Sequence, residues 1–335
     1  MPTSPSAPKP GFDRVNAYIA FGVFVISFIV YAMTVQRTFS FWDCGEFIAC
    51  SAILGIPHPP GTPLFIILGR IFSVIPFVED ISHRINYISV IGSALTAMFS
   101  YLLTVRLVGY FFGEKRHESL NRYIAYIGGI AGAFFVAFSD TNWANSVEAE
   151  VYGLALAMSV AIVWFTVRYF EQRGTDAATI SMMMAVYLAT LGIAVHMSVF
   201  LVLPVCAIFF VLKRSASARD WAILCGFFVV ELLMILLFSS GGGGASLFYV
   251  ISAILAVALV LLLYKQIRWG ILIALVSIGS VMMSFTVYGE VLPVAVAGLV
   301  ILGLIGKKYN VNVNWKGGLL LVLVAFIGLS VHFFI

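Results

Sequence analysis

Charged residues are scarce in this sequence: only 10% of its 335 residues are Asp, Glu, Lys or Arg. Soluble domains contain about 25% charged residues, so the composition excludes a sizeable water-soluble domain. It also excludes a nucleic-acid binder, because such proteins need a dense basic surface, and the net charge here is only +4.

Cysteine is scarce as well, with four residues and no Cys-x-x-Cys pair. A disulfide scaffold and a clustered zinc site are therefore excluded. The sequence also lacks a glycine-rich nucleotide-binding loop, so nothing in it supports ATP-driven transport.

Hydrophobic residues, in contrast, make up 62% of the sequence. They gather in runs close to the roughly 20 residues that a helix needs to cross a bilayer. We therefore predict an all-α polytopic membrane protein with about eleven transmembrane helices. The runs cover residues 16–34, 86–108, 122–139, 147–167, 180–195, 198–212, 221–238, 247–264, 269–287, 291–306 and 317–335.

Basic residues set the predicted orientation of these spans. With the N-terminus in the cytoplasm, all of the 19 Lys and Arg except Arg37, Arg70 and Arg84 fall on the cytoplasmic side, a bias typical of membrane proteins. The longest connection, residues 36–85, then lies outside. Because long loops in compact proteins are usually functional, we expect the chemistry in this first outer loop.

Two apolar segments need a separate interpretation. Residues 62–78 are predicted to form a re-entrant or interfacial helix, because a span there would move the basic residues 115–122 to the outer side. Residues 180–212 form one apolar run with basic flanks on both sides, which requires an even number of crossings. We predict two short spans, broken near His196.

The two ends of the chain differ in composition. Residues 1–12 are rich in Pro and Ser and are predicted to form a disordered cytoplasmic tail. Residues 13–335 are predicted to form one transmembrane domain. No polar flank follows the last apolar run, so we expect the chain to be the N-terminal part of a longer protein.

The motif FWDCGEF places two carboxylates, Asp43 and Glu46, at the exit of the first span. Three residues apart on a helix, they would share one face. Carboxylates at this depth are costly unless they are paired, hydrated or used, and they could provide a general base or hold a divalent cation. The alternative is a helix cap at the membrane interface, with Trp42 anchoring it.

The turn GIPHPPGTPLF contains His58, and the next span opens with Arg84 and Asn86. A rigid turn can hold an imidazole so that it bonds a phosphate or orients a carboxylate. Otherwise His58 is simply solvated. Arg84 and Asn86 could bind a lipid-linked phosphate, or they could anchor their helix at the headgroups.

The segment NWANSVEAEVY is predicted to open the fourth span. Asn145, Glu148 and Tyr152 would share one helical face, whereas Glu150 would point about 200° away from Glu148. We therefore expect only one of the two glutamates to face the first loop; both could instead serve the helix dipole. His196 is a further candidate because imidazoles at membrane depth are often functional, although a buried, satisfied histidine is equally consistent.

Taken together, the motifs DCGE, HPPGTPLF, RIN, EVY and GIAVHMSVFLVLP resemble a known family, over residues 12–212. It is a bacterial family long known only as a domain of unknown function, related to the vertebrate transmembrane O-mannosyltransferase that modifies plexin-type receptors. The resemblance implies a GT-C-type glycosyltransferase fold. It also implies transfer of a mannose-like sugar from a polyprenyl-phosphate carrier to Ser or Thr of an exported protein, at the outer face of a bacterial inner membrane.

The resemblance also implies roles for individual residues. Asp43 would be the catalytic base with Glu46 beside it, and three further motif residues would line the donor or acceptor site: His58, Glu150 and His196. The remaining substrate-binding candidates are Arg84, Asn86, Glu148 and Tyr152. No residue is assigned to a metal, and a divalent cation is left open. Two other functions also stay open, a transporter or flippase of lipid-linked solutes and a non-catalytic envelope scaffold.

Overall fold

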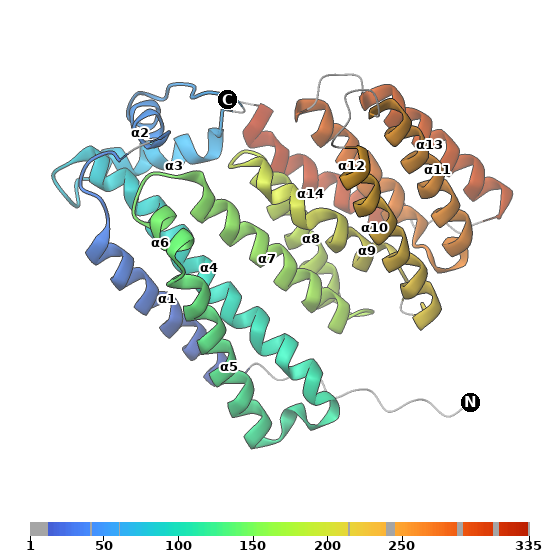
Figure 1. Ribbon diagram of the computed structural model, residues 1–335, viewed down its shortest axis with the longest axis horizontal. Helices are drawn as coiled ribbons and strands as arrows, with labels where there is room; N and C mark the ends of the chain where they lie inside the picture. The colour runs from blue at the N-terminus through green and yellow to red at the C-terminus, as the bar shows by residue number, and fades with distance from the viewer. Residues whose placement is uncertain are drawn as a thin grey trace. The chain divides into compact units, whose positions relative to one another are not determined.

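The computed structural model describes residues 13–40, 42–59, 61–213, 215–238, 245–286, 291–310 and 315–333. The predicted tail, residues 1–12, and Phe41 of the first-loop motif lie outside this part of the chain. The described residues fall into two compact units (Figure 1). Unit 1 comes from Met1–Arg168, Met184–Leu203 and Ile327–Ile335, and unit 2 from Tyr169–Met183 and Pro204–Phe326.

The centre of unit 1 is a long helix, α4 (Ile81–Phe112), against which α1 (Arg14–Thr34) and α5 (Ser119–Ala137) pack side by side (Figure 1). Two shorter helices, α2 (Cys44–Ile53) and α3 (Pro63–Val74), pack on each other and on α4. The remaining helices of this part of the chain are η1 (Gly113–His117), α6 (Asp140–Ser146), α7 (Val151–Glu171), α8 (Asp176–Gly192) and η2 (Met197–Val202).

Small residues let α4 and α7 approach each other closely. A Cβ atom added to Gly92 would lie 2.8 Å from the Leu154 backbone nitrogen, and one added to Gly153 would lie 2.6 Å from the Ser93 hydroxyl oxygen. Larger side chains would therefore push the two helices apart, as is usual where membrane helices pack through small residues. This close contact fixes the start of α7, which carries part of the site described below.

Unit 2 consists of helices joined by short connections. A bridge between Leu212 and Ile267 pairs the chain after α9 with the chain before α12, and Trp269 is buried beside it. The helices are α9 (Leu203–Val211), α10 (Ala218–Phe238), α11 (Ala245–Leu263), η3 (Tyr264–Gln266), α12 (Trp269–Thr286), α13 (Val291–Lys308) and α14 (Trp315–Phe333).

The all-helical prediction is confirmed, since each of the eleven apolar runs coincides with a helix and the described residues contain no strand. Within the part of the chain that the structure describes, four helical segments have the length and composition to cross a bilayer: Arg14–Thr34, Ile81–His117, Ser119–Ala137 and Val151–Glu171. The predicted break near His196 is present between α8 and η2. Residues 62–78 contain the 12-residue helix α3, which at about 18 Å is too short to span a bilayer. Eleven spans, the orientation and the GT-C fold remain predictions.

The fourth span begins slightly later than its apolar run. The run starts at residue 147, whereas α7 begins at Val151, and a turn separates it from α6. The backbone groups of this turn make bonds that a helix would not: the Val147 carbonyl accepts from the Gln36 N–H, and the Glu150 N–H donates both to the Glu148 carbonyl within the turn and to the Ser89 hydroxyl. Together these local and long-range bonds replace the bonds that a continuous helix would need.

Candidate active site

Asn86 anchors the beginning of the first loop. Its side chain is fully buried, and its amide nitrogen donates to the carbonyls of Gln36 (2.8 Å) and Thr38 (3.1 Å). These hydrogen bonds connect the segment that follows α1 to the first turns of α4. Asn86 thus positions the loop, and it is not among the residues that line the pocket described below.

Arg84 anchors the other end of the same loop. Its guanidinium donates to three backbone carbonyls, those of Ser73 (2.9 Å), Val78 (2.5 Å) and Glu79 (2.7 Å). Carbonyls near the end of a helix lack partners within the helix. Arg84 supplies hydrogen-bond donors to such carbonyls at the end of α3 and in the segment that follows it. The structure therefore does not bring Arg84 to the pocket, and its predicted role as a phosphate ligand remains a prediction.

Asp43 stands immediately before α2, whose buried face includes Cys44 and Phe47. Asp43 occupies the N-cap position that the helix-cap interpretation predicts, but its side chain makes no capping hydrogen bond. The preceding residue, Trp42, has a left-handed backbone (φ 64°) and is 91% exposed. Such a backbone is uncommon for a bulky residue and is found mainly where a ligand or turn requires it.

His58 is held by both oxygens of Glu46. Its backbone N–H donates to Oε1 and its ring Nδ1 lies against Oε2, each at 2.7 Å. The Glu46 carboxylate raises the pKa of His58, and the same hydrogen bonds lower the pKa of Glu46. The other ring nitrogen of His58, Nε2, lies 3.9 Å from Oδ2 of Asp43. Ligand atoms of Asp43, Glu46 and His58 all lie within 4.8 Å of one another, so this group could hold a metal ion.

The two glutamates before α7 both face the pocket, which corrects the expectation that they point in opposite directions. That expectation assumed a helix, but residues 147–150 form a turn. Glu148 accepts a hydrogen bond from the Ser40 hydroxyl, and the backbone N–H of Glu150 donates to Ser89 (3.1 Å). The turn is therefore fixed from both the first loop and α4.

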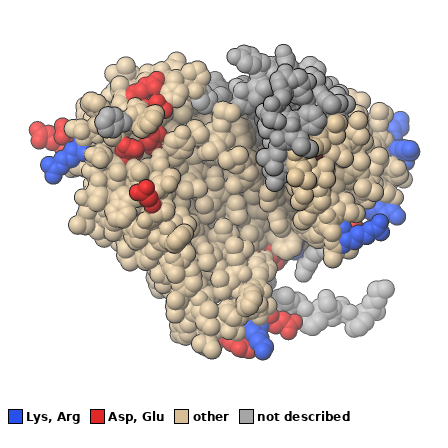
Figure 2. Space-filling model, viewed as in Figure 1, with Lys and Arg blue, Asp and Glu red and all other residues tan. Residues whose placement is uncertain are grey.

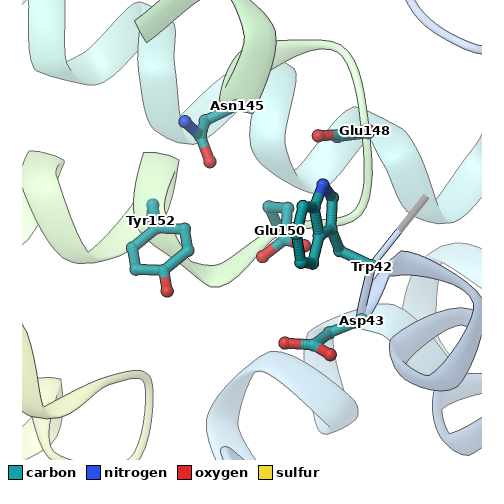
Figure 3. Close-up of a pocket in the computed structure, with 6 residues that line it drawn as sticks. All are labelled: Trp42, Asp43, Asn145, Glu148, Glu150 and Tyr152. Atoms are coloured by element: carbon teal, nitrogen blue, oxygen red, sulfur yellow. The ribbon is translucent and has the colours of Figure 1, made fainter. Parts of the chain in front are cut away.

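Together these segments enclose a pocket of about 290 Å³. In Figure 3 the carboxylates of Asp43 and Glu150 and the Tyr152 ring lie around the same open space, with Trp42 in front. Burial, followed by the nearby charges of Glu148 and Asp43, raises the pKa of Glu150 from 4.5 to about 7. The lining residues are Trp42, Asp43, Asn145, Glu148, Glu150 and Tyr152.

Three of the six lining residues, Asp43, Glu148 and Glu150, are acidic and none is basic, so the pocket favours positive charge. Figure 2 shows the acidic side chains gathered over this end of unit 1, near α2. A hydroxyl-rich molecule or a cation fits such a surface, whereas a bare phosphate would be repelled. Sequence reasoning missed Trp42 and Asn145 as pocket residues, because nothing in the pattern indicated that the turn at 147–150 would bring them together.

His196 lies behind the pocket wall. Its ring contacts the Tyr152 ring edge to face, with 5.0 Å between the centroids. Nδ1 accepts from the Ser198 N–H (3.1 Å), so the neutral ring carries its proton on Nε2. The Leu64 N–H donates to the Ala194 carbonyl (2.8 Å), which ties this segment to the start of α3.

The helices of membrane-spanning length identify a helical membrane protein. An acidic pocket beside its first loop provides a polar site. The profile of the family described as "Protein O-mannosyl-transferase TMEM260 N-terminal domain" matches residues 43–219, more than half of the chain. The chain belongs to this family. The predicted relation to the vertebrate O-mannosyltransferase is thereby confirmed.

Two relatives carry the same description. The protein O-mannosyl-transferase tmem260 of Dictyostelium discoideum is 28% identical over 214 residues, which are 60% of this chain and 24% of the relative. The TMEM260 protein of Mus musculus is 29% identical over 150 residues, 44% of this chain and 19% of the relative. The match thus covers about a quarter or less of the length of each of these relatives. No solved structure matches it.

Proposed function

We propose that this chain is the membrane part of a GT-C-type glycosyltransferase. It moves a mannose-like sugar from a polyprenyl-phosphate carrier to Ser or Thr of an exported protein, at the outer face of a bacterial inner membrane. The observation that carries this proposal is the Asp43 carboxylate, which opens onto the pocket and makes no capping bond. The family profile begins at this residue, and both relatives are named protein O-mannosyl-transferases.

Asp43 acts as the general base of an inverting transfer. The acceptor hydroxyl oxygen attacks C1 of the sugar, and its proton moves to the Asp43 carboxylate as the new C–O bond forms. The bond between C1 and the carrier phosphate breaks, and the phosphate oxygen leaves with the electron pair. The carboxyl-rich wall around Asp43 accepts hydrogen bonds from sugar hydroxyls, while the carrier chain lies among the apolar helices.

The test is sugar transfer by the purified protein in lipid nanodiscs, with polyprenyl-phosphate mannose and a Ser/Thr-containing acceptor peptide. Asp43→Asn should reduce transfer about 10²- to 10⁴-fold, because it removes the base while keeping the shape of the side chain. Asp80→Asn is the matched control: Asp80 is an exposed first-loop carboxylate outside the pocket, and its variant should keep wild-type activity.

Three outcomes separate the proposal from its alternatives. Wild-type transfer in Asp43→Asn would remove Asp43 as the base. Equal losses in both variants would indicate a general charge effect of the loop. No transfer by the wild type, with movement of the lipid-linked sugar across the bilayer, would favour a flippase.

A further inference from the structure

The imidazole of His58 has a carboxylate at each nitrogen, but the two contacts differ. On one side, the Nδ1–Oε2 distance to Glu46 is 2.7 Å, a short hydrogen bond. Because an ionised carboxylate only accepts, Nδ1 must carry the proton. In the neutral ring this leaves a lone pair on Nε2. A carboxylate that fixes the tautomer in this way is the usual outer partner of a metal-binding histidine.

On the other side, Nε2 and Oδ2 of Asp43 are 3.9 Å apart, too far for a hydrogen bond. Two ligands of one Mg²⁺ or Mn²⁺ ion, each bonded at about 2.1 Å in octahedral geometry, lie about 3 Å apart. The side chain of Asp43 is 55% exposed and makes no capping bond, so a small rotation brings its oxygen to that separation.

Glu150 provides a separate indication that a cation belongs here. The residue is only 6% exposed and lines the same pocket as Asp43. The backbone N–H of Val151 bonds its carboxylate and His58 lies near enough to interact with its charge, but among the described residues no basic side chain bonds it directly. Figure 3 shows the carboxylate turned toward the space that Asp43 also faces. A buried carboxylate without a directly bonded cation is costly, and a cation near Asp43 would lower that cost.

We propose that Nε2 of His58 and the carboxylate of Asp43 bind a divalent transition-metal ion such as Mn²⁺, with Glu46 orienting the imidazole. Two protein ligands leave most coordination positions to water, which is how these ions usually bind before a phosphate joins them. That the phosphate belongs to a polyprenyl carrier rests on the proposed function. The cation would then let an anionic phosphate approach a wall that carries no basic residue.

The experiment titrates Mn²⁺ into the purified protein without substrate and follows free Mn²⁺ by electron paramagnetic resonance. The titration is repeated with polyprenyl phosphate present. The wild type should show one saturable site that polyprenyl phosphate tightens. Asp43→Asn and His58→Gln should abolish it, and Glu46→Gln should weaken it about 10- to 100-fold, the usual effect of losing an outer partner.

Matched controls remove the same chemical groups elsewhere in the loop. Asp80→Asn removes an exposed carboxylate, and His83→Gln removes an imidazole that contacts the Tyr87 ring; both should bind Mn²⁺ like the wild type. Because His58→Gln could disturb its turn, melting temperatures are measured without metal. Asp43→Asn provides the result that does not depend on that turn.

Absence of saturable Mn²⁺ binding, alone and with polyprenyl phosphate, would overturn the inference. So would equal binding by Asp43→Asn and Asp80→Asn. Full sugar transfer in the presence of a chelator, together with no Mn²⁺ binding, would contradict the cation site but would support the proposed transferase function. Specific Mn²⁺ binding without sugar transfer would keep the cation site and remove the proposed function.

Discussion

At the junction between α4 and the first loop, the side chains of Arg84, Asn86 and Ser89 bond backbone atoms of the segments around them. In the pocket, by contrast, the carboxylates of Asp43 and Glu150 face open space. Both regions are polar, and both contain motif residues, so the sequence made them equal candidates for substrate binding. The structure separates them: side chains with internal bonds support the site, and those without such bonds can act on a ligand.

The largest effect on stability should come from the junction, at Asn86. Asn86→Ala removes two hydrogen bonds and leaves two carbonyls without their partner at a fully buried position. We expect the free energy of unfolding to fall by about 2–3 kcal/mol, measured as a lower melting temperature in detergent. Asn145→Ala, on the pocket wall, should change it by less than about 0.5 kcal/mol. Equal losses of stability in Asn86→Ala and Asn145→Ala would contradict the distinction between residues that support the loop and residues that line the pocket.

Arg84→Gln tests whether this residue supports the loop or binds phosphate. The variant loses its bonds to the carbonyls of Ser73, Val78 and Glu79, so we expect stability to fall by about 1–2 kcal/mol. The KM for the sugar donor should stay unchanged in the folded fraction. A higher donor KM with an unchanged melting temperature would instead make Arg84 a phosphate ligand, as the sequence suggested.

Glu150 should affect stability in a way that depends on pH. Its pKa is about 4.5 in the unfolded chain and about 7 in the folded protein, so folding favours the protonated form. The stability that this provides is complete below pH 4.5 and is lost as the pH rises to about 7. Glu150→Gln should therefore be more stable than the wild type by about 1–2 kcal/mol at pH 8, allowing for partial solvation, and equally stable at pH 4.

The measurement is the difference in melting temperature between Glu150→Gln and wild type at the two pH values. Asn145→Ala is the control on the same wall, because its substitution changes no titrating group and its difference should be the same at both pH values. A pH-independent gain for Glu150→Gln would show that the carboxylate is not perturbed by burial.

Membership of the family could be predicted from the sequence because it depends on local motifs. The motif around Asp43 and the proline-rich turn at His58 are contiguous in the chain. The partnership of Glu46 with His58 was not predicted, since it joins residues 12 positions apart across a turn whose shape the pattern does not specify. The same holds for Trp42, whose place in the pocket depends on an unusual backbone conformation.

The sequence by itself determined the helical class and the approximate positions of the apolar helices, because hydrophobic length acts within one segment. The break near His196 followed from the basic residues on both sides of the run 180–212. Only the tertiary structure decided which polar residues face the pocket. Gln36 and Ser89 bond the backbone at Val147 and Glu150, and these contacts interrupt the helix that the sequence pattern favours. A hydrogen bond between distant segments can outweigh helical continuity at a single turn, and that turn places both glutamates at the site.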